Sequence, residues 1–384
     1  MNEDKATRYH RLRRRAVVVS SAWAVVLLTG LLLSGLSRTL SDASSAMTAG
    51  WPALVRQPLA VCAWVAAVVA AYETGALPLG FYTGFTLERR YGLSRQSASS
   101  WLRDHAKAAG VQFVFAAIAA AWVSSSLRLW PAGWWLVAWA GAVAAAEAIA
   151  WAAPVLLLPL FYTFAPLENA ALRDRLMALA AKAGVPALGT FEWRLGDRTS
   201  RTNAALTGVG TTRRIIVSDT LIADCQEDEV EVVLAHELAH HVHHDVWRTL
   251  AVDALVGGVT LAVSADVLRA AVAPLGLRGI ADVAGLPLVA LTAIAAGWLA
   301  SPAVNALSRA HERRADRFAL DLTGNPDAFV RAMRRLGARN LAEDAPTLLA
   351  RVFFHTHPPL KDRLAAARRW TADQGVRAAT GREA

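Results

Sequence analysis

Cysteine is nearly missing from this chain of 384 residues, which contains two cysteines and four methionines. Cys62 lies in a long apolar segment and Cys225 in a polar one, which excludes a disulfide framework. A zinc site built from thiolates is excluded as well, because such sites combine several cysteines at short spacing. The low cysteine content is typical of a protein whose thiols face a reducing compartment.

Charged residues are also few for a chain of this length. They make up 18% of the residues, whereas hydrophobic residues make up 55% and tryptophan occurs 14 times. The mean hydropathy of +0.32 is too high for an ordinary soluble enzyme of this size. The composition therefore predicts a protein that lies in a lipid bilayer.

Long apolar segments occur six times in the sequence. Each is long enough to cross about 30 Å of hydrocarbon as a helix. We place them at residues 17–36, 59–82, 111–127, 134–161, 250–268 and 286–304. The first segment is too long for the apolar part of a signal peptide, and no clear small-residue cleavage site follows it. It is therefore predicted to be a membrane anchor.

Basic residues indicate how these segments are oriented. The tail before the first segment contains six of them: Lys5, Arg8, Arg11, Arg13, Arg14 and Arg15. The positive-inside rule places this tail in the cytoplasm, and counting the spans places residues 163–249 and 305–384 there as well. The net charge of +9 is explained by these flanks and by contact with anionic lipid head groups. Nucleic acid is therefore not an expected partner.

Three acidic residues lie inside the predicted spans, at Glu73, Glu147 and Asp253. Carboxylates are costly in hydrocarbon and usually face the interior of a helix bundle or water. Two interpretations apply to them. They line a polar cavity, or each pairs with a neighbouring helix and only holds the bundle together.

A short motif indicates metal chemistry, at His236-Glu237-Leu238-Ala239-His240. The preceding residues read as helix, and a spacing of four places both imidazoles on one helix face with a carboxylate beside them. Two histidines in this arrangement are zinc ligands, and Glu237 is the expected general base. By itself the motif also fits a structural or surface pair of histidines, so the rest of the site has to be found elsewhere.

A catalytic zinc takes three protein ligands and leaves one position open. Glu312 is the candidate for the third ligand, and Asp316, four residues later on the same helix face, is positioned to accept a hydrogen bond from a ligand imidazole. The same stretch also fits an ordinary charged helix face. His244, one turn beyond His240, is a rival ligand. The metzincin continuation fails, because it requires glycine and histidine where the chain has His243 and Val246.

The sequence divides into four parts without internal repeats. Residues 1–162 hold four predicted spans, 163–249 form a zinc protease domain, 250–306 hold two further spans, and 307–384 are a helical part that completes the site. Within the second part we expect helices at 167–183 and 228–248, strands at 190–195 and 213–217, and a turn at 208–212.

Several blocks of the sequence resemble the integral-membrane CAAX prenyl endopeptidases and their bacterial relatives, a branch of the gluzincin metalloproteases. They are Pro159 to Leu167, Asn203 to Gly208 with Arg213 to Leu221, His236 to His240 with Glu312 and Asp316, and His355 to Leu360 with Arg363. A weaker match is Glu88 to Ser94. The resemblance covers most of the chain and implies a mostly α-helical fold: a polytopic membrane bundle of about six spans with a cytoplasmic gluzincin-type α+β zinc protease domain.

The same resemblance implies roles for further residues. His357 is expected to stabilise the oxyanion of the tetrahedral intermediate with Arg363 assisting, and Asn203 to contact the backbone of a peptide added to an edge strand. Each chain would hold one Zn²⁺ and hydrolyse peptide bonds with a water that the metal activates. His357 also fits a residue that caps a turn before two prolines.

The expected partners are the lipid bilayer and a peptide or membrane-protein substrate, with or without a prenyl group. The location is a membrane, with the site on the cytoplasmic side, and the Ala- and Arg-rich composition favours a bacterial inner membrane. Two alternatives stay open. One is a quality-control protease of membrane proteins without prenyl specificity, and the other is a metal-holding membrane scaffold or transporter that uses Glu73, Glu147 and Asp253.

Overall fold

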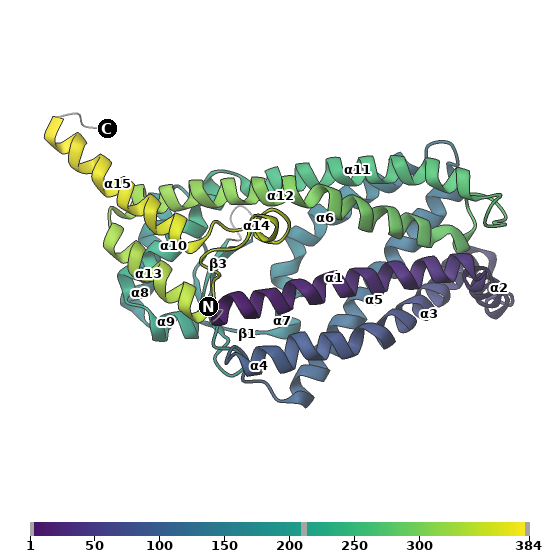
Figure 1. Ribbon diagram of the computed structural model, residues 1–384, viewed down its shortest axis with the longest axis horizontal. Helices are drawn as coiled ribbons and strands as arrows, with labels where there is room; N and C mark the ends of the chain where they lie inside the picture. Colours follow the sequence, from purple (N-terminus) through teal and green to yellow (C-terminus); the bar gives the residue numbers. More distant parts are fainter. Residues whose placement is uncertain (1–3, 209–212, 381–384) are drawn as a thin grey trace.

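The computed structural model describes residues 4–208 and 213–380. Of the predicted turn at 208–212, Gly208 is described and residues 209–212 lie outside the described residues. Six helices in the described part are long and apolar enough to cross a membrane, which confirms the predicted number. They are α1 (Lys5–Leu33), α3 (Ala53–Phe81), α5 (Ala98–Leu129), α6 (Trp134–Leu156), α11 (Asp245–Ala271) and α12 (Leu286–Thr323). They run along the long axis of the molecule (Figure 1).

Tryptophan side chains of one membrane helix pack directly against glycines of a neighbouring helix. A Cβ at Gly75 would lie 2.3 Å from the indole of Trp23, and one at Gly141 would lie 2.2 Å from that of Trp122. Trp23 Nε1 also donates to Tyr72 O at 3.0 Å, and Trp122 Nε1 donates to Val137 O at 3.2 Å. Glycine lets helices approach closely in lipid, and these bonds leave neither indole N–H unpaired. This packing accounts for part of the high tryptophan content.

Short elements close the bundle at both ends. Helix α2 (Leu36–Met47) follows Gly35, whose φ of 75° turns the chain, and it packs on the 3-10 helix η3 (Val283–Gly285) through Ser37 Oγ, which donates to Ala284 O at 2.8 Å. At the other end α3 continues into the π-helix η1 (Tyr82–Leu87) and α4 (Glu88–Arg90). The short helix α7 (Leu158–Phe161) follows α6.

A four-stranded sheet lies at the end of the bundle that carries the N-terminus (Figure 1). The strands are β1 (Thr163–Pro166), β2 (Thr190–Arg194), β3 (Ala204–Thr207) and β4 (Arg214–Ser218), in the order β1-β2-β4-β3. Strands β2 and β4 are parallel, whereas β1 and β3 pair antiparallel to their neighbours. The predicted strands at 190–195 and 213–217 are confirmed, and β3 is an edge strand.

Helices from two distant parts of the chain surround this sheet. They are α8 (Ala170–Lys182), α9 (Asp219–Asp224), α10 (Glu227–Val242), α13 (Pro326–Arg339), α14 (Leu348–Phe354) and α15 (Leu360–Thr380). One hydrophobic core joins all of them except α14, which packs on α12, and it includes Leu176, Leu234, Phe329 and Trp370. The residues after the last span therefore complete the same globular part as residues 163–242.

The predicted helix at 228–248 is confirmed as far as Val242, but its continuation through 243–244 is wrong. Helix α10 ends at Val242, His244 adopts the left-handed conformation with φ of 56°, and α11 begins at Asp245 in a new direction. The prediction that His244 continues the face of His236 and His240 is therefore wrong too. Left-handed backbone is uncommon for residues other than glycine, so the periodicity of the sequence did not reveal this break.

One of the three acidic residues inside the spans has a clear partner. Glu73 of α3 lies 3.0 Å from His105 Nε2 of α5, and His105 stacks on Trp101. This pair joins two helices of the bundle, which favours the structural interpretation for Glu73.

Candidate metal centre

Helix α10 presents the motif residues because its beginning and its opposite face are fixed. Gln226 and Glu229 form a capping box, and the fully buried Glu229 also pairs with Arg331 and Arg335 of α13. Val230, Leu234 and Leu238 are buried in the core of this part of the molecule. The same spacing that buries these residues turns His236 and His240 toward α12.

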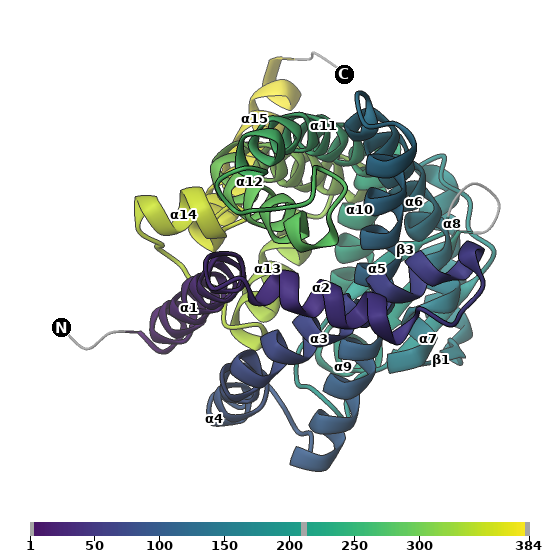
Figure 2. The same cartoon turned by 90° about the vertical axis from the view of Figure 1, so that its right-hand side faces the viewer.

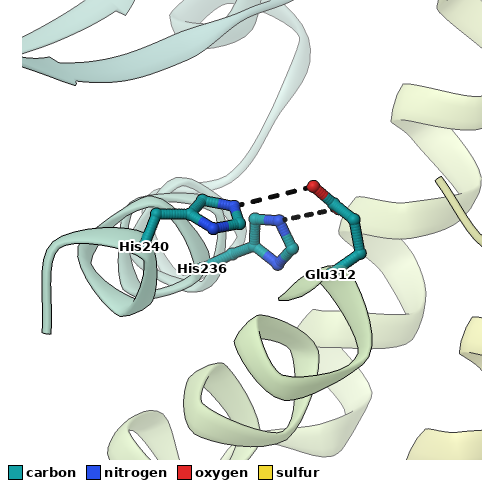
Figure 3. A group of neighbouring side chains, drawn as sticks. All are labelled: His236, His240 and Glu312. Carbon is teal, nitrogen blue, oxygen red and sulfur yellow. Dashed lines mark ion pairs between the residues drawn. The ribbon is translucent and has the colours of Figure 1, made fainter. Parts of the chain in front are cut away.

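Three donor groups converge between α10 and α12 (Figure 3). His236 Nε2 lies 3.2 Å from Glu312 Oε2, and His240 Nε2 lies 3.6 Å from Glu312 Oε1. One ligand atom from each residue lies within 4.8 Å of the other two. The structure therefore brings together the three residues predicted as metal ligands.

The chemistry of this group fits a zinc ion. Two imidazole nitrogens and one carboxylate oxygen are the donors of a common type of catalytic zinc site. Glu312 Oε2 is buried and makes no hydrogen bond, although it faces the imidazole of His236. A buried carboxylate oxygen without a hydrogen bond is costly unless a cation satisfies it. The residues present therefore fit a bound metal.

Asp316 supports His236 as the sequence predicts. Asp316 Oδ1 lies 3.0 Å from His236 Nδ1, the nitrogen that faces away from Glu312. Arg363 of α15 donates two hydrogen bonds to the Asp316 carboxylate. Such a carboxylate fixes the tautomer and orientation of a ligand imidazole, and Arg363 in turn balances its charge.

Asp245 has the same relation to His240, and the sequence reasoning missed it. Asp245 Oδ2 lies 3.0 Å from His240 Nδ1, and the side chain is 5% exposed. Arg314 of α12 pairs with Oδ1 of the same carboxylate. On an uninterrupted helix Asp245 would lie on another face than His240, so only the break at His244 brings it back. The signal in the sequence was a carboxylate five residues after the second histidine.

The surroundings shift the pKa values of His236 and Glu237, and the causes differ between the two. Burial lowers the pKa of His236, but the neighbouring carboxylates of Asp316 and Glu312 outweigh burial and raise the pKa to about 9. Burial raises the pKa of Glu237, against the charges of His236 and His240. A carboxylate with a raised pKa is a better proton acceptor than an ordinary one, which suits general-base chemistry.

The remaining predicted residues line the same cavity, which has a volume of about 650 Å³. His357 Nε2 lies 3.4 Å from Glu312 Oε1, and its side chain is 63% exposed. Partial burial lowers the pKa of His357, and the charge of Glu312 opposes this. Arg363 and Asn203 line the cavity from α15 and from the residue before β3.

Helix α14 positions the loop of His357. Asn305 Nδ2 of α12 donates to Val352 O at 3.1 Å, and Arg309 donates to Arg351 O at 2.8 Å and His355 O at 2.7 Å. These bonds satisfy carbonyls at the C-terminal end of α14. The loop that carries His357 is thus attached to the helix that carries Glu312.

Two family models match the chain and together cover nearly all of it. The model described as peptidase family M48 matches residues 166–371, and the model described as CAAX prenyl protease N-terminal, five membrane helices, matches residues 2–163. The boundary between them falls at the start of β1.

Curated proteins and a solved structure are similar to the chain. "CAAX prenyl protease 1 homolog" of Arabidopsis thaliana is 30% identical over 310 residues, which are 79% of this chain and 72% of the relative. "Uncharacterized metalloprotease YhfN" of Bacillus subtilis is 28% identical over 292 residues, or 75% of this chain and 68% of the relative. The crystal structure of S. mikatae Ste24p has a TM-score of 0.81 at 20% identity and covers 94% of this chain and 87% of its own, which shows a shared fold.

Proposed function

The chain belongs to peptidase family M48 and is a membrane metalloendopeptidase of the CAAX prenyl protease type, and we propose that it works with one zinc ion held by His236, His240 and Glu312. The observation that carries this proposal is the group of three donor residues, two of which, His236 and Glu312, line one cavity together with Glu237. The family match shows a metallopeptidase, and the donor set supports zinc as the metal.

The side chains around the metal divide the work of peptide hydrolysis. Zinc in this site supplies a Lewis acid that makes water a better nucleophile near neutral pH. Glu237 accepts the proton of the attacking water and passes it to the leaving amine. His357 and Arg363 donate hydrogen bonds to the carbonyl oxygen as it gains negative charge. Asp316 and Asp245 hold the two imidazoles in place.

The substrate is proposed to lie along β3. This strand is the edge of the sheet, and Asn203 and Ala204 line the cavity that contains the metal ligands. An extended peptide that adds to an edge strand gains backbone hydrogen bonds without any requirement on its side chains. Asn203 is positioned at the beginning of this strand to contact the peptide backbone.

The substrate class is proposed to be proteins anchored in the membrane near their C-terminus, with a prenyl group as the anchor. Support comes from the similarity to CAAX prenyl proteases and from α12, which carries Glu312 and also crosses the membrane. The basic N-terminal tail supports a cytoplasmic site, and the similarity to a Bacillus subtilis protein supports a bacterial membrane. Residues 163–249, which lie between the two membrane parts in sequence, and residues 307–384 would then form the protease part together.

Cleavage of a farnesylated CAAX peptide and its unprenylated twin tests this proposal. We expect detergent-purified protein with one bound zinc to prefer the farnesylated peptide. In the Glu237→Gln variant we expect turnover to fall by roughly 10²- to 10⁴-fold or more while zinc stays bound, because only the proton acceptor is lost. Retained turnover in this variant would sink the mechanism.

Equal cleavage of both peptides would favour a quality-control protease without prenyl specificity. Bound zinc without cleavage of either peptide would contradict both protease proposals for these substrates. The scaffold or transporter alternative predicts zinc binding that tolerates Glu237→Gln and no hydrolysis at all.

A further inference from the structure

The free side of β3 is short. Asn203 directs both its backbone N–H and its carbonyl toward Ser218 of the sheet. Because backbone groups alternate along a strand, those of Ala204 point away from the sheet. The next outward carbonyl, of Leu206, already accepts a hydrogen bond from His241 Nε2 at 3.0 Å. The outward rung that is left for a substrate is therefore Ala204, next to the metal helix.

A peptide that pairs antiparallel with β3 at this rung has a defined direction. In an antiparallel pair one residue exchanges both of its backbone hydrogen bonds with a single partner, the pattern that already joins β3 to β4. A peptide bound to Ala204 in this way runs against β3. Its C-terminal end then points back along the chain, past Asn203 and Thr202 toward Arg201. All four residues line the cavity that contains His236.

Helix α1 covers this end of the cavity. His10, Arg13, Arg14 and Val17 line it, and their spacing of three, four and seven places them on one helix face. The N-terminal end of helix α1 lies beside the globular part (Figures 1 and 2). The C-terminal end of a bound peptide therefore meets a basic helix face.

Two of the three arginines at this end are already neutralised. Arg14 lies 2.5 Å from a carboxylate oxygen of the buried Glu343, and Arg201 lies 2.9 Å from Glu88 Oε2. Arg13 differs from both. Its guanidinium donates to Tyr9 Oη at 3.2 Å and lies over the Tyr9 ring, and within residues 4–208 and 213–380 no carboxylate pairs with it. Arg13 is the surplus positive charge of this end of the cavity.

We propose that Arg13 binds the C-terminal carboxylate of the substrate. Guanidinium and carboxylate form charge-assisted hydrogen bonds, and the exposed Arg13 side chain lines the cavity without a carboxylate partner of its own in the described residues. Arg14 and Arg201 keep the end of the cavity basic but are held by their own partners. This inference rests on the proposed peptidase function and names the part of the substrate that is recognised.

The test compares two farnesylated peptides that differ only at the C-terminus, one with a free carboxylate and one with a carboxamide. We expect the zinc-loaded native enzyme to show a kcat/KM roughly two- to fivefold higher for the carboxylate, the range expected for an ion pair with an exposed arginine. Arg13→Gln should lower the value for the carboxylate to that for the carboxamide. Arg13→Lys, which keeps the charge but not the paired donors, should retain part of the preference.

A binding measurement makes the test independent of turnover. In the Glu237→Gln background, we expect a short peptide to bind roughly two- to fivefold more tightly with a free C-terminal carboxylate than as the amide, and Arg13→Gln to remove this difference. Arg15→Gln is the matched control, because Arg15 lies two residues along the same basic helix and does not line the cavity. It should leave both ratios unchanged.

The outcomes separate this inference from the proposed function. Cleavage of both peptides at the same rate would overturn the role of Arg13 and leave the peptidase proposal intact, whereas cleavage of neither would contradict the peptidase proposal. An equal loss for both peptides in Arg13→Gln that depends on anionic lipid in the assay would assign Arg13 to a lipid head group instead. That result would also overturn the inference.

Discussion

Each of the two histidines of the metal centre contacts a carboxylate that pairs with an arginine, but the two sides differ in how far they are exposed to solvent. His236 contacts Asp316, which pairs with Arg363, and His240 contacts Asp245, which pairs with Arg314. Both carboxylates are almost fully buried. The His236 side is closed, with the imidazole 8% and the arginine 15% exposed, whereas on the His240 side these values are 22% and 34%.

On the closed side both partners of His236 come from distant parts of the chain, whereas on the open side the carboxylate is local and only Arg314 comes from α12. Asp316 and Arg363 come from α12 and α15, whereas Asp245 follows His240 by five residues. Water can replace part of a lost partner at the open side but has little access to the closed one. We therefore expect the His236 side to be the more sensitive of the two to substitution.

Glu312 joins the two sides, so its replacement should have the largest effect. Glu312→Gln removes the charged ligand that faces both imidazoles. Loss of one of three ligands should weaken zinc binding roughly a thousandfold, since the whole binding free energy of such sites is of order 10 kcal/mol. Competition with a fluorescent chelator measures this. Native-like zinc affinity in Glu312→Gln would rule out the proposed ligand set, and Glu237→Gln serves as the control that keeps all three ligands.

The next largest effects distinguish the two supporting carboxylates. Removal of such a partner typically costs ten- to a hundredfold in metal affinity. We expect Asp316→Asn to lie near the upper end, because it also leaves the buried Arg363 without its partner, and Asp245→Asn to lie near the lower end. The same chelator assay reports both values. A larger loss for Asp245→Asn would invert the comparison.

The pH dependence of zinc binding should follow the titration of His236, the histidine on the closed side. The pKa of His236 is raised to about 9 in the metal-free protein, and zinc binds only the neutral imidazole. Apparent zinc affinity should therefore rise about tenfold per pH unit from neutral pH up to about 9, with release of one proton. Stability of the metal-free protein has the opposite sign, because the contribution from protonated His236 is lost as pH rises from about 6.5 to 9.

Calorimetry in buffers of different ionisation enthalpy counts the released proton. Asp316→Asn should shift the rise in zinc affinity to lower pH, because Asp316 is one of the two groups that raise the pKa of His236. Zinc affinity that does not change between pH 7 and 9 in the native protein would contradict this account.

The smallest effect concerns the two arginines. Arg314→Gln should change kcat/KM only a few-fold, because the guanidinium is 34% exposed and solvent screens the pair. Arg363→Gln should lower kcat more than it changes zinc affinity, since Arg363 also lines the substrate cavity. Steady-state kinetics with metal content measured in parallel separates the two effects. Equal behaviour of the two variants would remove the functional distinction between them.

The sequence predicted those parts of the molecule that follow from periodicity and local spacing. Six apolar stretches predicted six spans, and the strands at 190–195 and 213–217 followed from runs of β-forming residues. Glu312 and Asp316 were found because both lie on one face of one helix. The spans and strands could be predicted because residues close in sequence stay close in space. Glu312 and Asp316 could be predicted because their spacing on one helix is distinctive.

The parts that the sequence did not reveal depend on a change of direction or on contacts between distant residues. Asp245 was missed because His244 interrupts the helix in a conformation that few residues other than glycine adopt. Arg13 received no role beyond membrane topology, because its place at the cavity depends on how α1 packs against residues 201–204 and 355–359. No periodicity in α1 encodes that contact.

Helix α12 sets the distance between the membrane-spanning part of the protein and the metal centre. It runs without interruption from Leu299, whose side chain is 83% exposed among the apolar span residues, to Glu312 thirteen residues later. At 1.5 Å per residue this is about 20 Å, a length that an extended peptide covers in about six residues. A substrate whose anchor lies at the depth of Leu299 can therefore place at the metal centre only peptide bonds that are about six or more residues away from the anchor. Cleavage nearer to the tether requires the anchor itself to rise out of the hydrocarbon along the protein surface.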